Sequence, residues 1–147
     1  MGTRRKGREL ALQALYQLDV TSDASEEALR RFWGQCEASP DAREFAAQIV
    51  DGVLQRREEI DRLVEEVSEH WRIERLSRVD LNVIRIAVYE LTADTALPPE
   101  VAINEAIEVA RRFGTEESAG FVNGILDPLA RRLGASGGED KVRQKDG

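Results

Sequence analysis

Apolar residues recur along the chain at every third or fourth position, and this spacing predicts helices separated by short polar breaks. The first predicted helix covers residues 4–19, and Ser25 caps the second. Ser39 and Pro40 supply a cap for the third and a proline at its first helical position. The pattern loses its register across residues 56–59, which predicts that one helix ends there and another begins.

The most apolar segment covers residues 81–91, where hydrophobic side chains occur nearly all round a helix. We therefore expect a central helix that the other helices surround. Its β-branched residues also suit a strand, but its length and the predicted capping pair of Ser77 and Asp80 favour a helix. No segment shows the clean alternation that marks a strand. The predicted fold class is therefore all-α, a compact bundle of about seven helices.

Residues 101–127 predict two helices that meet at a sharp corner. Gly114 is expected to end the first of them in the left-handed conformation that residues with a Cβ resist. Thr115 is expected to cap the second helix, which Pro128 would strain. Phe121 lies just beyond the corner, and its periodicity suits the core at least as well as the surface.

Residues 134–147 are rich in glycine and charge and carry no apolar periodicity, so we expect a disordered, charged tail. The preceding residues 1–133 are expected to form a single helical domain, in line with a length of 147 residues. No apolar run approaches the roughly 20 residues needed to cross a bilayer. No apolar signal segment follows the basic N-terminus. We therefore expect a cytoplasmic protein.

The formal net charge is −7, so a nucleic acid would have to bind at a local basic patch against a repelling background. Such a patch occurs at the start of the first predicted helix, at Arg4, Arg5, Lys6 and Arg8. Cations in a first turn oppose the helix dipole, which makes an anionic partner a reasonable hypothesis. The alternative is a frayed, solvated terminus, which these residues alone favour.

Base recognition would need aromatic or amide side chains beside this basic turn. Phe121, Asn123 and Gln13 are candidates if the fold brings them together. Core packing is the alternative for Phe121, and a local backbone role is the alternative for Asn123, which precedes a glycine. The spacing of these residues does not decide between base recognition and these structural roles.

The sequence offers little for catalysis or metal binding. Cys36 is the only cysteine and His70 the only histidine, which nearly excludes a thiolate metal site or a Cys–His catalytic pair. The chain also lacks a phosphate-binding GxxxxGK[ST] loop and a GxSxG nucleophile motif. Adjacent glutamates such as Glu65 and Glu66 point in different directions on a helix and do not converge on a substrate. We expect no enzymatic activity, no catalytic residue, no metal and no cofactor.

Three segments of the chain resemble the NusB family of bacterial transcription antitermination proteins: RRKGRELALQALYQLD at 4–19, RVDLNVIRIAVYEL at 78–91 and VAINEAIEVARRFGTEESAGFVNGILD at 101–127. The resemblance spans residues 4–133, and the ordered combination of VAINEAIE, FG and FVNGILD is highly specific. It implies an all-α fold in two helical halves, without enzymatic activity.

The resemblance also implies a function and a set of partners. The protein is expected to bind the boxA RNA element of ribosomal-RNA leader transcripts, as a heterodimer with the small-subunit ribosomal protein NusE. This complex would join other Nus factors on RNA polymerase and help the polymerase to read through terminators. Some members of the family self-associate, so a homodimer is a further expectation that stays open.

Residues that match the family's RNA-binding positions are Arg4, Arg5, Lys6, Arg8, Gln13, Glu117, Ser118 and Phe121. The resemblance implies that the basic residues meet phosphates and base edges. It also implies that Phe121 stacks on a base, with Glu117 and Ser118 at the rim of the RNA site.

Three further residues match the family's binding face for the ribosomal protein: Tyr16, Glu74 and Asp80. The segment that contains His70 and Trp71 varies within the family, so the resemblance implies no role for either residue.

Two other interpretations of the chain stay open. The same fold occurs as the N-terminal recognition domain of an RNA cytosine methyltransferase. That enzyme needs a catalytic domain with a nucleophilic cysteine, and the sequence is expected to end before such a region. The chain could instead be a helical adaptor or homodimer that binds only protein, in which case the basic turn is merely solvated. Titration with boxA RNA, with and without the ribosomal protein, separates these interpretations.

Overall fold

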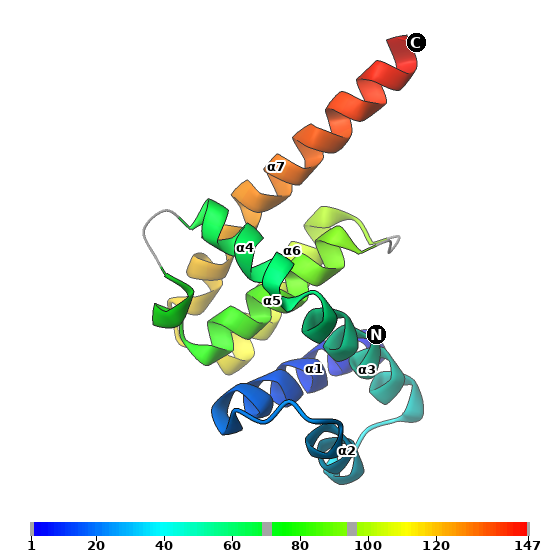
Figure 1. The fold of residues 1–147 in the computed structure, drawn as a ribbon, viewed down its shortest axis with the longest axis vertical. Helices are drawn as coiled ribbons and strands as arrows, with labels where there is room; N and C mark the ends of the chain where they lie inside the picture. Colours follow the sequence, from blue (N-terminus) through cyan, green and yellow to red (C-terminus); the bar gives the residue numbers. More distant parts are fainter. Residues whose placement is uncertain (1, 69–71, 94–96, 147) are drawn as a thin grey trace.

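The computed structural model describes residues 2–68, 72–93 and 97–146, with side chains up to residue 134. These residues form seven α-helices and one short 3-10 helix, with no strand among them, so the predicted all-α class is confirmed (Figure 1). The elements are α1 (Gly2–Thr21), α2 (Glu26–Gln35), α3 (Pro40–Gln55), α4 (Arg57–Val67), η1 (Ile73–Arg75), α5 (Arg78–Thr92), α6 (Pro99–Phe113) and α7 (Ser118–Asp146). His70 and Trp71 lie outside the described residues.

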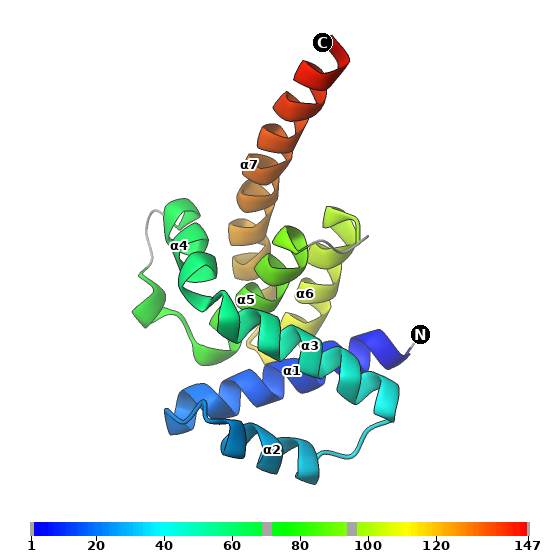
Figure 2. The same cartoon turned by 45° about the vertical axis from the view of Figure 1, so that its right-hand side comes forward.

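The helices form two groups that share one core. Helices α1, α2 and α3 lie together on one side of the molecule, and α4 to α7 lie on the other (Figure 1, Figure 2). Helix α5 packs against α1, α3, α4, α6 and α7, and residues 81–88 are all buried. The prediction of a central helix surrounded by the others is therefore confirmed. None of the helices in the described part of the chain is long and apolar enough to span a membrane.

Serine caps fix the starts of three helices, as the sequence predicts. The hydroxyls of Ser25, Ser39 and Ser77 each accept a backbone N–H from three residues further on, at 3.0–3.2 Å. The break between α3 and α4 falls at Arg56, within the predicted interval. Only half of the predicted capping pair at α5 forms, because the Oδ1 atom of Asp80 is buried without a hydrogen-bond partner in the described structure.

The corner between α6 and α7 corrects the prediction for Gly114. Its φ of −97° and ψ of −157° are extended, not left-handed. Glycine is needed there for space, because a Cβ at this position would lie 2.6 Å from the Cβ of Ser118 and 2.8 Å from the carbonyl oxygen of Ala110. The hydroxyl of Thr115 accepts the N–H of Glu117 at 3.3 Å within the turn before α7, which begins only at Ser118, so Thr115 is not the N-cap residue of that helix.

Helix α7 is not interrupted at Pro128. It runs as a single helix to Asp146, and its last part projects away from the other helices (Figure 1, Figure 2). The disordered, charged tail from residue 134 and the domain boundary before it stay predictions.

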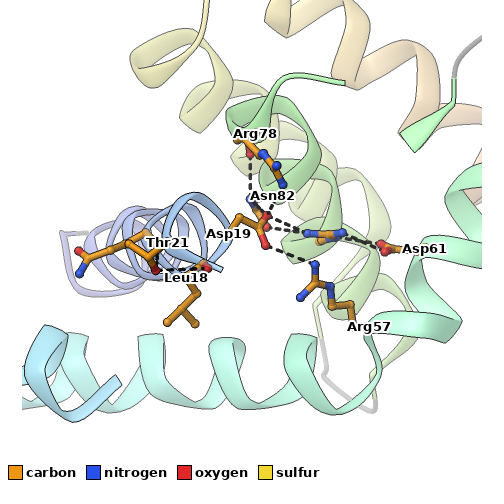
Figure 3. Close-up of polar contacts among 9 residues, drawn as sticks. Leu18, Asp19, Thr21, Arg57, Asp61, Arg78 and Asn82 are labelled. Atoms are coloured by element: carbon orange, nitrogen blue, oxygen red, sulfur yellow. Dashed lines mark hydrogen bonds and ion pairs between the residues drawn. The ribbon is translucent and has the colours of Figure 1, made fainter. Parts of the chain in front are cut away.

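A polar network connects the two groups of helices in the interior (Figure 3). The Arg85 guanidinium of α5 donates to both carboxylate oxygens of Asp61 on α4, at 2.8 and 2.9 Å, and to Asp19 on α1, at 3.1 Å. The side chains of Arg85 and Asp19 are only 4% and 6% exposed. Asn82 donates a further hydrogen bond to Asp19, at 2.8 Å. This network fixes the end of α1 against α4 and α5.

Candidate nucleic-acid interface

Two hydrogen-bonded ion pairs connect α1 to α6 in the same order along both helices. Arg5 donates to Glu105 at 3.2 and 3.3 Å, and Arg112 donates to Glu9 at 2.8 and 2.9 Å. The basic turn of α1 therefore lies beside the first half of α6. Gln13, further along α1, and Phe113, the last residue of α6, line the same groove.

Three of the four predicted RNA-binding cations lie at the surface. Arg4, Arg5 and Lys6 are exposed, and the Arg4 guanidinium lies over the ring of Phe45, 5.7 Å from its centroid. The hydrogen bonds from Arg5 to Glu105, with the attraction of the same carboxylate, raise the pKa of the Arg5 guanidinium above its ordinary value. This side chain is therefore a permanent cation. The turn offers exposed positive charge to an anionic ligand.

Arg8 does not belong to this exposed set. Its guanidinium donates to both carboxylate oxygens of Glu90 on α5, at 2.8 and 2.9 Å. The two side chains are 5% and 6% exposed. The Phe45 ring covers the same guanidinium, with its centroid 5.4 Å away. Arg8 therefore joins α1 to α5, and its role in RNA binding stays a prediction.

The corner before α7 separates the predicted RNA residues into surface and interior positions. Glu117 and Gln13 are exposed, and Phe121 is partly buried against the core. Ser118 is only 2% exposed, and its hydroxyl accepts the Thr115 N–H at 2.9 Å. This side chain therefore holds the corner together, and its place at the rim of an RNA site stays a prediction.

An apolar groove of about 470 Å³ lies on a neighbouring face, between α1, α2, α5 and α6. It is lined by Leu12, Gln13, Tyr16, Gln17, Val20, Thr21, Phe32, Val79 and Phe113. Tyr16 and Val20 are large hydrophobic side chains exposed at this groove. Asp80 follows the groove residue Val79, and Glu74 is exposed in η1. Exposed apolar side chains gathered in a groove are typical of protein-binding surfaces.

Sequence reasoning missed the acidic partners of the basic turn. The arginines of α1 and α6 are neutralised by Glu9, Glu90 and Glu105. Arg8 and Glu90 are 82 positions apart in the sequence, and Arg5 and Glu105 are 100 positions apart. No local spacing could identify such pairs. In the part of the chain that the structure describes, no group of three or more histidine, cysteine, aspartate or glutamate side chains could hold a metal ion.

Comparisons with known proteins give one consistent result. The profile of the NusB family matches residues 5–131. The transcription antitermination protein NusB of Myxococcus xanthus is 49% identical over 137 residues, which cover 90% of this chain and 98% of that protein. The corresponding protein of Desulfatibacillum aliphaticivorans is 45% identical over 145 residues, with 99% of both chains covered.

Two solved structures extend the comparison to three dimensions. T. maritima NusB is 40% identical and superposes with a TM-score of 0.78, over 87% of this chain and 90% of that chain. A chain from a crystal structure of the antitermination factors NusB and NusE in complex with double-stranded RNA is 27% identical. It also superposes with a TM-score of 0.78, over 90% of this chain and 98% of that chain.

Proposed function

Because this chain belongs to the NusB family, we propose that it is an RNA-binding transcription antitermination factor. It binds the boxA element of ribosomal-RNA leader transcripts together with the ribosomal protein NusE, and helps RNA polymerase to read through terminators. The observation that carries this proposal is the exposed basic turn of α1, in a fold shared with a NusB that was solved together with NusE and RNA. Other Nus factors and RNA polymerase complete the assembly. The protein works in the cytoplasm and without catalysis.

The proposed RNA-binding residues are Arg4, Arg5, Lys6, Gln13, Glu117 and Phe121. The cations hold phosphates, Gln13 and Phe121 contact bases, and Glu117 lies at the rim. The protein has a net charge of −7 and contacts only a few phosphates. RNA binding by the isolated protein is therefore weak and depends only modestly on salt. A basic ribosomal protein adds a second patch and raises the affinity through linkage of the two sites.

The proposed partner face comprises Tyr16, which lines the apolar groove, and the acidic residues Glu74 and Asp80. The groove supplies apolar area, and the acidic side chains suit a basic ribosomal protein. This face and the basic turn both include α1, so RNA and partner would bind to adjacent parts of one helix.

The first prediction concerns base stacking. Phe121→Ala is expected to weaken boxA binding by about 1–3 kcal/mol, the usual contribution of one base stacked on an aromatic ring. Phe121→Trp keeps an aromatic face and is expected to retain most of the affinity. Phe121→Leu keeps an apolar side chain against the core, and is expected to resemble the alanine variant. Anisotropy titrations measure the affinity, and circular dichroism checks the fold. Unchanged affinity in a folded alanine variant would remove Phe121 from the site.

The second prediction concerns the partner face. Asp80→Lys is expected to weaken NusE binding by at least about tenfold, because it replaces an acidic group with a cation facing a basic protein. The cost to folding is expected to be about 0.3–1 kcal/mol, the usual effect of a cation near a helix N-terminus. Asp41→Lys makes the same change in the first turn of α3, which also has a serine cap. Calorimetry should show normal NusE binding by this control, and normal binding by the Asp80 variant would count against the face.

A further inference from the structure

The ion pairs between arginines and glutamates along α1 and α6 differ in burial and in hydrogen-bond distance. Arg8 and Glu90 form a buried pair with short bonds on both oxygens. Glu9 is 7% exposed, so the loss of Arg112 would leave a buried carboxylate without that cation. Arg5, by contrast, has a side chain that is 54% exposed, and its bonds to Glu105 are the longest of the three pairs, at 3.2 and 3.3 Å.

Glu105 can release Arg5 without becoming an isolated charge. Its carboxylate lies 3.9 Å from Nη1 of Arg8, which stays in place through its bonds to Glu90. Glu105 is also 21% exposed, so water can solvate the oxygen that Arg5 leaves. An exposed ion pair of this kind contributes little to stability, whereas a phosphate can accept both donors of the same guanidinium. The Arg5–Glu105 pair is therefore the exchangeable one of the three.

We propose that Glu105 competes with the RNA backbone for Arg5 and so limits the affinity of the RNA site. In the free protein Arg5 is bound to Glu105. In the complex its guanidinium turns to a phosphate, and Glu105 remains beside Arg8. This inference rests on the proposed RNA-binding function, and it adds a residue of α6 that acts on affinity without touching the RNA.

The experiment is a double-mutant cycle on the full chain with NusE present, read by anisotropy of labelled boxA RNA. Glu105→Gln removes the competing charge, Arg5→Ala removes the guanidinium, and the double variant combines both changes. The matched control is Glu65→Gln, an equal change of charge at an exposed position of α4. Thermal melts by circular dichroism establish that each variant is folded.

Glu105→Gln is expected to tighten boxA binding about two- to fivefold when Arg5 is present, and to have no effect in the Arg5→Ala background. Glu65→Gln is expected to change affinity less than Glu105→Gln does. An equal gain in both backgrounds would mean that Glu105 acts only through total charge, and no gain in either would mean that it does not compete. Both results overturn the inference while wild-type boxA binding upholds the proposed function. Failure of the wild-type complex to bind boxA would overturn the proposed function itself.

Discussion

Replacement of Arg85 by alanine is expected to destabilise the protein by about 3–5 kcal/mol, the usual effect of removing one partner from a buried ion pair. Asp19 on α1 would then be left buried without its shortest ion pair, and Asp61 on α4 would lose both of its hydrogen bonds from Arg85 (Figure 3). Domains of this size have unfolding free energies of about 5–15 kcal/mol, so much of the stability would be lost. Urea unfolding followed by circular dichroism measures the change.

Arg57→Ala is the matched control for this network. Arg57 also donates to Asp19, but at 3.4 Å and from a far more exposed side chain. Its replacement is expected to cost less than about 1 kcal/mol. Equal losses for the two variants would contradict the role of Arg85 as the centre of the network that joins the two groups of helices.

The second large effect is expected for Arg8→Ala. This change removes the guanidinium that donates to both carboxylate oxygens of the buried Glu90 on α5, so we again expect a loss of about 3–5 kcal/mol in unfolding free energy. Arg4→Ala removes an exposed guanidinium from the same Phe45 ring and is expected to cost less than about 1 kcal/mol. Urea titrations of both variants distinguish a buried structural arginine from a surface one. Wild-type stability of the Arg8 variant would return Arg8 to the RNA-binding set.

The helical architecture could be predicted from the sequence because its signals are local. Periodicity indicated the helices and the buried central one, and the serines at 25, 39 and 77 marked helix starts that the structure confirms. The break near Arg56 was equally visible, because a shift of register changes which residues share a face.

The errors come from contacts between distant or tightly packed groups. Arg8 lies in the first turns of α1 beside exposed cations. Only the packing of α5 against α1 shows that Arg8 forms an ion pair with Glu90. Gly114 follows a helix, where a left-handed glycine is common, but the observed constraint is the closeness of Ser118. Ser118 is also buried, because it lies on the same face of α7 as Val122 and Ile125, four and seven residues further on.

In the candidate site, too, some features follow from local sequence and others depend on how the helices pack. Arg4, Lys6 and Gln13 are exposed on α1, and for Lys6 and Gln13 this exposure follows from the polar side of an amphipathic helix. The pairing of Arg5 with a glutamate 100 positions away depends on how α1 meets α6. Binding roles for these residues, for Glu117 and Phe121, and for the partner face stay predictions that the variants above test.

The most direct test of the central claim compares boxA RNA with a scrambled RNA of the same composition. Anisotropy titrations at fixed salt would use the full chain, first alone and then in a preformed complex with NusE. We expect the complex to bind boxA at least about tenfold more tightly than the scrambled RNA, a difference of about 1.4 kcal/mol, and more tightly than the chain alone does. Equal affinity of the folded complex for the two RNAs would contradict the proposed function.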